Sequence, residues 1–198
     1  MTPATLIPRP ETELLVEEAA RRLGTAPCRA LDLGTGSGCV AIGLTHLLPA
    51  CKMVAVEQSF EALQVARRNG RRHGVAKLVA FVQGDWLDAL RGADVFDAIV
   101  ANPPYIPTDE LTSLPPDVQQ EPRAALDGGP DGLRYHRWLL QDGAARLRPG
   151  GWLLMELGHG QALAVAAQAS SIPWWTAPDC VRDHQGIERV FVTQRRIR

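Results

Sequence analysis

The sequence has no apolar run long enough to span a membrane, and it has almost no net charge. Its start, from Met1 to Pro8, lacks the positively charged beginning and long apolar stretch of a secretory signal peptide. Lysine and arginine number 21 against 22 aspartate and glutamate residues, so no general attraction to nucleic acid or to an anionic membrane is expected. These absences predict a cytoplasmic protein with no membrane attachment and no stable nucleic-acid binding.

Cysteine and histidine are too scattered for a disulfide framework or a metal site. The 4 cysteines form no Cys-x-x-Cys pair, and none has a histidine at metal-ligand spacing. The 5 histidines also lie apart without forming a recognisable cluster. We therefore expect reduced thiols, because disulfides are uncommon in the cytosol, and a chemistry that needs no metal.

What the sequence does contain is an alternation of short apolar strands and amphipathic helices. The predicted strands cover residues 30–33, 53–56, 78–82, 96–101, 152–157 and 187–192. The predicted helices cover residues 11–23, 39–48, 60–73, 133–147 and 161–169. Strands separated by helices indicate an α/β protein with a parallel sheet covered on both faces, and 198 residues suit a single domain.

Glycine-rich or polar segments follow four of the predicted strands. They are the loop 34–38, Glu57, the pair Asp85-Trp86 and Asn102. Because ligands of parallel sheets bind at the carboxyl ends of the strands, we expect these segments to meet at one edge of the sheet. Residues 103–130 form the longest stretch without a predicted helix or strand, which indicates a lid or a substrate-binding loop.

The most informative segment is Asn102-Pro103-Pro104-Tyr105. Each proline fixes φ and lacks a backbone donor, and Pro104 holds Pro103 extended, so the Pro103 carbonyl is expected to project without a partner. The Asn102 amide supplies a second acceptor, and Tyr105 supplies a flat aromatic face. Together they form a candidate clamp for a planar NH2 group. A rigid turn after a strand is the alternative interpretation.

The loop Gly34-Thr35-Gly36-Ser37-Gly38 indicates a ligand that contains a nucleoside. Its glycines allow a ligand to approach the backbone, and the helix that follows offers free N–H groups. Glu57 ends the next strand, where a carboxylate can accept both hydroxyls of a ribose. Cys39 stands where the dinucleotide pattern requires its third small residue, so the loop disfavours NAD.

This G-x-G-x-G loop resembles the first motif of the Rossmann-like class I methyltransferases, which use S-adenosylmethionine. The resemblance implies a mostly parallel seven-stranded sheet with helices on both faces. It also implies that the loop 34–38, Glu57 and Asn102 contact this cofactor and that Asp85 lies near the adenine amine. Trp86 is expected against the adenine ring, with a place in the core as the alternative.

Segments along nearly the whole chain resemble the release factor glutamine N5-methyltransferases. They are Pro8-Arg9-Pro10-Glu11-Thr12-Glu13, Gln83 to Trp86, Asn102 to Tyr105, Leu153 to Gly158, and Arg182-Asp183 with Glu188-Arg189-Val190. The chain departs from that family at Gln120-Glu121-Pro122, where the family tends to have Phe-Glu-Pro. The family also carries an N-terminal helical domain before the first of these segments. Residues 1–198 are therefore expected to form one methyltransferase catalytic domain without that helical domain.

The resemblance implies methyl transfer to the side-chain amide nitrogen, N5, of the glutamine in the Gly-Gly-Gln motif of class 1 peptide-chain release factors. S-adenosylmethionine would be the donor and S-adenosylhomocysteine the product, with no metal. Asn102, Pro103 and Tyr105 would be the catalytic residues, and the substrate site would also include Pro104, Arg9 and Thr12. Capping at a helix start is an alternative role for Arg9 and Thr12.

Three other functions share parts of these patterns. Adenine-N6 methyltransferases of DNA or RNA carry the same tetrapeptide at Asn102, but they need a base-flipping surface and usually a basic groove. A glutamine of another protein, such as a ribosomal protein, is an alternative target. A cofactor-binding subunit that serves only as an interaction partner is the third, and the intact tetrapeptide argues against it.

Overall fold

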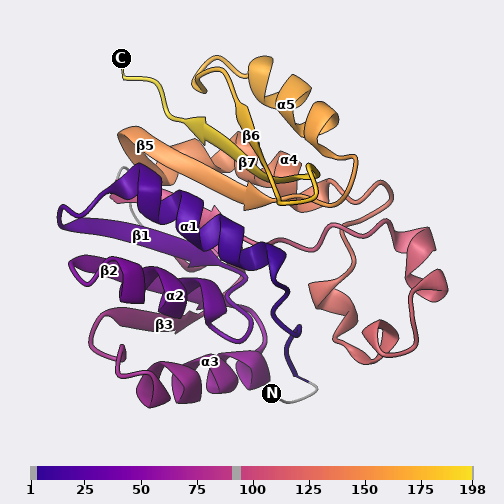
Figure 1. The fold of residues 1–198 in the computed structure, drawn as a ribbon, viewed down its shortest axis with the longest axis horizontal. Helices are drawn as coiled ribbons and strands as arrows, with labels where there is room; N and C mark the ends of the chain where they lie inside the picture. The colour runs from indigo at the N-terminus through magenta and orange to yellow at the C-terminus, as the bar shows by residue number, and fades with distance from the viewer. Residues whose placement is uncertain (1–3, 91–94, 198) are drawn as a thin grey trace.

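The protein folds around one seven-stranded sheet with the strand order β3-β2-β1-β4-β5-β7-β6 (Figure 1). The structure is a computed structural model, and it describes residues 4–90 and 95–197. Every strand except β7 runs in the same direction. The strands are β1 (Cys28–Leu33), β2 (Cys51–Glu57), β3 (Val79–Gln83), β4 (Phe96–Ala101), β5 (Leu147–Glu156), β6 (Asp179–Arg182) and β7 (Glu188–Gln194). The expected α/β fold with a mostly parallel seven-stranded sheet is confirmed.

Helices cover both faces of this sheet. One face carries α1 (Glu11–Leu23), α2 (Cys39–Leu47) and α3 (Phe60–Arg72), and the other carries α4 (Arg134–Asp142) and α5 (Ala162–Ser170). In Figure 1, α1 and α2 lie in front of the sheet and α4 lies behind it.

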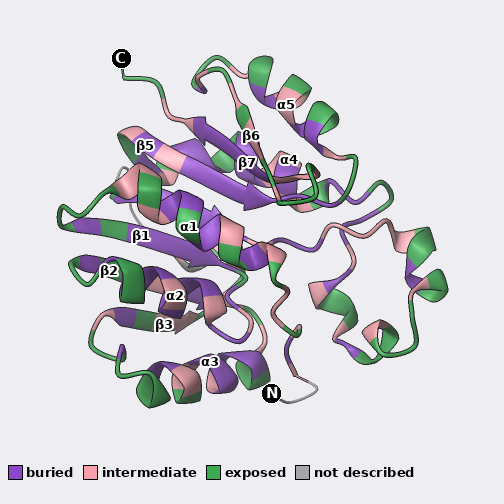
Figure 2. Cartoon of the chain, viewed as in Figure 1, coloured by how far each residue is buried: buried purple, intermediate pink, exposed green. Residues whose placement is uncertain are grey.

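Several small side chains of the central strands face α1 and α2. Ala30, Ala55 and Ala98 belong to the core cluster under α1 and α2, whereas Leu31 and Ile99 belong to the cluster on the side of α4. The small residues allow α1 and α2 to pack closely on the sheet. Figure 2 shows the resulting buried centre, in which these strands are almost entirely covered.

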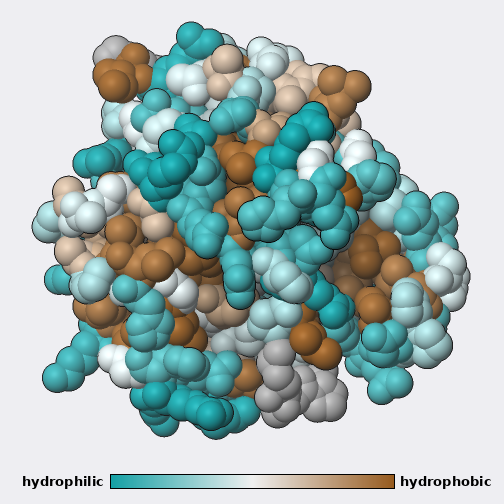
Figure 3. All heavy atoms as spheres, viewed as in Figure 1, coloured by the Kyte–Doolittle hydropathy of each residue, from teal (hydrophilic) through white to brown (hydrophobic). Residues whose placement is uncertain are grey.

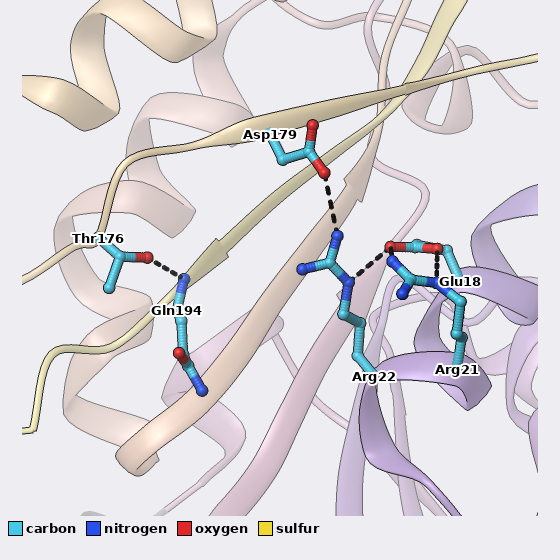
Figure 4. A network of polar contacts seen from close by, with 6 residues as sticks. All are labelled: Glu18, Arg21, Arg22, Thr176, Asp179 and Gln194. Carbon is cyan, nitrogen blue, oxygen red and sulfur yellow. Dashed lines mark hydrogen bonds and ion pairs between the residues drawn. The ribbon is translucent and has the colours of Figure 1, made fainter.

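Charged side chains join α1 to the edge strand β6 (Figure 4). The buried carboxylate of Glu18 accepts hydrogen bonds from Arg21 at 2.7 Å and from Arg22 at 2.6 Å. Arg22 also bonds to Asp179 on β6 at 3.0 Å and lies over the Trp152 ring, 4.8 Å from its centroid. Because Asp179 is exposed, its ion pair adds little stability, but the contacts fix where α1 crosses the sheet.

Two elements differ from the sequence prediction. The helix predicted over 133–147 ends at Asp142, residues 143–146 form a 3₁₀ turn, and Leu147 already begins β5. The apolar pattern continues through this turn, so periodicity alone does not show where the helix ends. Strand β6 was not among the predicted strands, because its residues are only half-buried or exposed and form no apolar run.

Residues 103–130 project from the sheet as a lobe, at the right of Figure 1. Its secondary structure consists of three short 3₁₀ turns, Thr108–Ser113, Val118–Gln120 and Arg123–Ala125. Backbone hydrogen bonds close its base, from the Ile106 N–H to the Leu126 carbonyl at 3.0 Å and from the Gly128 N–H to the Ile106 carbonyl at 2.8 Å. The long irregular stretch is therefore an ordered lobe with a fixed base.

Three further observations concern membrane-spanning helices, metal-binding clusters and the cysteine side chains. Within residues 4–90 and 95–197, no helix is long and apolar enough to cross a membrane. In the same ranges, no three His, Cys, Asp or Glu side chains are arranged to hold a metal ion. The cysteines are free thiols, with Cys28 and Cys51 buried and with Cys39 and Cys180 partly buried.

Candidate active site

The carboxyl ends of β1 to β4 meet at one edge of the sheet. Leu33 lies opposite both Val56 and Ala101, and Glu57 lies opposite Gln83. Residues just beyond these strand ends line one cavity, which we call the first cavity; among them are Gly34, Gly36, Glu57, Gly84, Trp86 and Asn102. The structure thus brings the four predicted segments together.

Positive φ angles and a buried carboxylate shape the loop after β1. Gly34 and Gly36 have φ of +71° and +55°, which favours glycine, and a Cβ at Gly34 would lie 3.4 Å from the Trp86 indole. Behind the loop, Asp32 accepts hydrogen bonds from Thr35 Oγ1 at 2.6 Å and from a backbone N–H of α2 at 3.1 Å. Burial raises the pKa of Asp32 to about 7, although both hydrogen bonds oppose this rise.

The loop residues divide into two groups. Gly34 and Gly36 line the first cavity. Thr35 and Ser37 are buried, and the Ser37 carbonyl accepts a hydrogen bond from a side chain of α3 at 2.8 Å. Gly38 precedes α2 with φ of +85° and packs against α3. Thr35, Ser37 and Gly38 therefore stabilise the loop from behind and do not line the first cavity.

Glu57 holds the loop through its carboxylate at the end of β2. Its Oε2 accepts the Gly36 N–H at 2.9 Å, and its Oε1 accepts the Ser59 N–H at 2.9 Å. A carboxylate has about four acceptor positions, so about two remain for a ligand in the first cavity. This arrangement suits a ligand with two neighbouring hydroxyls.

Trp86 forms an aromatic wall of the first cavity. Its ring stacks on Tyr135 of α4, with centroids 4.7 Å apart and planes 22° apart, and Trp138 meets it edge-on at 5.8 Å. Trp86 has φ of +44°, the one positive value for a non-glycine residue in the described ranges. Such backbone strain is typical of functional sites.

Two neighbours of this wall differ from the sequence prediction. Asp85 is exposed beside the wall and does not line the first cavity. Tyr135 lines the cavity but was not predicted from the sequence.

A second cavity of about 240 Å³ lies on the other side of Asn102. Its lining is mainly apolar and consists of Leu6, Arg9, Asn102, Pro103, Tyr105, Ile106, Val118, Ala125 and Leu126. Figure 3 shows hydrophobic surface in the hollow between the 103–130 lobe and the rest of the molecule. Asn102 lines both cavities, and Pro104 lines the first.

The Asn102 amide is held from behind by two buried side chains. Asn102 Nδ2 donates to Thr12 Oγ1 at 3.2 Å, and Thr12 Oγ1 donates to Glu156 Oε2 at 2.8 Å. Among the described residues, none donates a hydrogen bond to Asn102 Oδ1 or to the Pro103 carbonyl. Both acceptors that the sequence predicts for an NH2 group thus lack a partner within residues 4–90 and 95–197. Thr12 is 4% exposed and lies behind Asn102, outside the lining of the second cavity.

Glu156 lies at the end of β5 and is 1% exposed. Burial raises its pKa to about 7, although the hydrogen bond from Thr12 opposes this rise. His136 on α4 donates its Nε2–H to the Glu156 carbonyl at 2.8 Å, and burial lowers the pKa of His136. Neither residue was assigned a role from the sequence, and only the resemblance of the segment from Leu153 to Gly158 indicated this part of the chain.

Tyr105 is fixed through its backbone. Its carbonyl accepts a hydrogen bond from Gln161 Nε2 at 2.8 Å, and Gln161 Oε1 accepts the Gly158 N–H at 2.9 Å. Gly132, with φ of +73°, has no room for a Cβ because it would overlap the Tyr105 carbonyl. Burial raises the pKa of Tyr105 to about 12, so its phenol is neutral near pH 7.

Arg9 joins the N-terminal segment to the 103–130 lobe. Its Nη2 donates to Glu121 Oε1 at 2.8 Å, and the side chains are 33% and 6% exposed, respectively. The same two segments complete the first cavity with Leu6, Pro122 and Ala125. The Arg9–Glu121 pair spans 112 positions in the chain, and no local pattern could have identified Glu121 as its partner.

Comparison with known proteins identifies the family. Residues 10–114 match the family described as methyltransferase small domain. A release factor glutamine methyltransferase of Moorella thermoacetica is 47% identical over 199 residues, which cover 99% of this chain and 69% of that protein. Another from Geobacter sulfurreducens is 47% identical and covers 96% of this chain and 66% of that protein. The chain belongs to the release factor glutamine methyltransferase family.

A solved structure agrees with this family assignment. It is the protein-(glutamine-N5) methyltransferase (release factor-specific) from Alicyclobacillus acidocaldarius, with a TM-score of 0.59 and 30% identity, covering 100% of this chain and 99% of that one. The expected class I methyltransferase fold, the family and the enzyme class are confirmed. In this member of the release factor glutamine methyltransferase family, the segment from Pro8 to Glu13 thus brings Thr12 behind Asn102.

Proposed function

We propose that this chain transfers a methyl group from S-adenosylmethionine to the N5 amide nitrogen of the glutamine in the Gly-Gly-Gln motif of class 1 peptide-chain release factors. The observation that carries the proposal is the position of Asn102, which lines both cavities and leaves its Oδ1 free. The first cavity suits a nucleoside, and the second suits an uncharged side chain that ends in NH2. The family to which the chain belongs is named for this reaction.

The residues of the first cavity fit S-adenosylmethionine. Gly34 and Gly36 allow the ligand close to the backbone, and Glu57 keeps acceptor positions for the two ribose hydroxyls. Trp86 offers its ring to the adenine, and the exposed Asp85 remains the proposed partner of the adenine amine. When bound, S-adenosylmethionine supplies an electrophilic methyl group on its sulfonium sulfur.

Positioning is the main contribution of Asn102 and Pro103, because an amide nitrogen is a poor nucleophile. The glutamine NH2 donates one hydrogen to Asn102 Oδ1 and the other to the Pro103 carbonyl. With both hydrogens held in the amide plane, the lone pair of the nitrogen points out of that plane, toward the first cavity. Positioning of this kind contributes roughly 7–11 kcal/mol in favourable cases. The two acceptors also stabilise the positive charge that develops on the nitrogen, and the excess proton leaves after methyl transfer.

The second cavity suits the rest of the glutamine side chain. The Tyr105 ring covers the planar amide, and Pro104 lines the first cavity next to Asn102 and Pro103. With its pKa raised to about 12 by burial, Tyr105 does not act as a base near pH 7. We assign Arg9 to the substrate site because it lines this cavity and holds the 103–130 lobe beside it.

The test is to incubate the chain with labelled S-adenosylmethionine and a class 1 release factor. We expect label on the Gly-Gly-Gln glutamine and none on a factor in which that glutamine is replaced by alanine. The matched enzyme variant, Asn102→Ala, should lose transfer and retain cofactor binding. Label on adenine-containing DNA or on a ribosomal protein, with none on the release factor glutamine, would contradict the proposal. Cofactor binding without any methylation would instead support an interaction subunit.

A further inference from the structure

A chain of two hydrogen bonds runs inward from the second cavity and ends on a buried carboxylate. It joins Asn102 after β4, Thr12 in the first turn of α1 and Glu156 at the end of β5. Thr12 is 4% exposed and Glu156 is 1% exposed, so these two side chains are shielded from water. Three distant parts of the chain therefore meet behind the group that is proposed to grip the substrate.

The count of hydrogens decides which way the Asn102 amide faces. An ionised Glu156 can only accept, so the single hydroxyl hydrogen of Thr12 goes to Oε2 at 2.8 Å. The Thr12 oxygen can then only accept, which requires the NH2 end of the Asn102 amide to point at it, at 3.2 Å. If the amide were turned over, Asn102 Oδ1 would face the Thr12 oxygen with no hydrogen between them. The opposite end, Oδ1, is thereby left for the cavity.

We propose that Thr12 and Glu156 are positioning residues that fix the Asn102 amide with its oxygen toward the substrate NH2 group. This inference rests on the proposed function, because it assigns the two residues a part in gripping the glutamine amide. Neither residue touches the substrate, since neither lines the second cavity.

Only the ionised carboxylate makes this arrangement the single one possible, because it cannot donate. If Glu156 takes up a proton, its own hydroxyl can donate to Thr12, whose hydrogen is then free to bond Asn102 Oδ1 and hold the amide the wrong way round. Burial raises the pKa of Glu156 to about 7, so this change falls near neutral pH. The titratable or charged groups that act on this region are Glu11 on α1, Arg189 on β7, Tyr105 after β4, His136 on α4 and Cys39 on α2.

The first test compares Thr12→Val with Thr12→Ser. Valine keeps the shape of threonine and removes the hydroxyl, whereas serine keeps the hydroxyl. We expect Thr12→Val to lower kcat by about tenfold or more and Thr12→Ser to recover most of the rate, because only serine can accept from Asn102 and donate to Glu156. The matched control is Thr45→Val, which removes another buried hydroxyl, bonded within α2, and should leave kcat unchanged.

A double-mutant cycle separates positioning from support of the fold. If Thr12 acts only through the Asn102 amide, Thr12→Val should have no further effect on kcat in the Asn102→Ala background. A role limited to starting α1 would instead lower the activity or the melting temperature equally in both backgrounds. Binding of S-adenosylhomocysteine and the melting temperature, measured for every variant, show whether each one is folded.

The pH profile provides a readout that a supporting role would not change. The kcat of the wild type should rise between about pH 6 and pH 8 as Glu156 ionises, since only the ionised form fixes the amide. In Glu156→Gln this rise should be absent, because the glutamine side chain has no proton to lose in this pH range.

Failure of the proposed function and failure of the positioning role give different results. If the wild type does not methylate the release factor glutamine, the proposed function is wrong. If the wild type does methylate it, a kcat of Thr12→Val equal to that of the wild type would overturn the positioning role. So would additive losses in the double-mutant cycle, or an unchanged pH rise in Glu156→Gln.

Discussion

The two cavities on either side of Asn102 are built in different ways. The floor of the first is made by the ends of strands β1 to β4, and Glu57 holds it through bonds to Gly36 and Ser59, while Leu6, Pro122 and Tyr135 complete its rim. The second depends on contacts across the chain, such as the Arg9–Glu121 pair, whose partners are 112 positions apart. The groups proposed to bind the nucleoside thus lie mostly at the ends of the strands, whereas the substrate site is formed mostly by segments that lie far apart in the chain.

This difference separates the expected effects of mutations. Changes in the first cavity should weaken cofactor binding and leave the chemical step intact. Changes around the second should alter turnover or release factor affinity and leave cofactor binding intact. Asn102 lines both cavities, so its replacement is the strictest test of whether cofactor binding and turnover can be separated.

The largest effect is expected for Asn102→Ala. Loss of the Oδ1 acceptor should lower kcat by about 100- to 1000-fold, as removal of one preorganised polar group does in other active sites. The matched control, Asn69→Ala, removes the amide that bonds the Ser37 carbonyl behind the glycine loop, and should weaken cofactor binding with little change in kcat. Steady-state kinetics and calorimetry with S-adenosylhomocysteine measure both quantities. Equal kcat losses in the two variants would contradict the distinction between the two cavities.

An intermediate effect is expected for Glu57→Ala. Loss of the carboxylate that bonds the loop and is proposed to accept the ribose hydroxyls should raise the cofactor Kd by about 10- to 100-fold. At saturating cofactor, kcat should stay close to the wild-type value. Glu61→Ala removes an exposed carboxylate from the first turn of α3 and serves as the control with unchanged Kd. A lower kcat with an unchanged Kd for Glu57→Ala would place this residue in the chemical step.

The smallest effect is expected for the pair that joins the N-terminal segment to the lobe. Arg9→Glu and Glu121→Arg should each raise the KM for the release factor by about three- to tenfold, because a partly exposed ion pair is replaced by like charges. The swapped variant, R9E/E121R, should recover much of this loss, which a double-mutant cycle detects. Strictly additive effects would mean that the pair does not hold the substrate site together.

Prediction from the sequence was most accurate for features that depend on residues close together in the chain. The helix over 11–23 has the predicted bounds, and the glycine loop, Glu57 and Asn102 each follow a strand end, as expected. Prediction failed at β6, an edge strand without an apolar pattern, and at the end of α4, where an apolar 3₁₀ turn continues the helical periodicity.

The parts of the site that could not be predicted are those made by tertiary contacts. Tyr135 reaches Trp86 from α4, Glu121 reaches Arg9 from the lobe, and Glu156 reaches the site from β5. Each of these side chains gains its place only through packing, so no spacing rule could have assigned it. Thr12 was expected at the substrate, and the structure instead places its hydroxyl between Asn102 and Glu156.

The central claim is that the free oxygen of Asn102 directs methyl transfer to a glutamine amide. Its most direct test is fragmentation mass spectrometry of a class 1 release factor after reaction with the wild type and with Asn102→Ala. We predict one added methyl group on the side-chain nitrogen of the Gly-Gly-Gln glutamine with the wild type, and almost none with the variant. A methyl group at any other position, or equal methylation by both proteins, would contradict the claim.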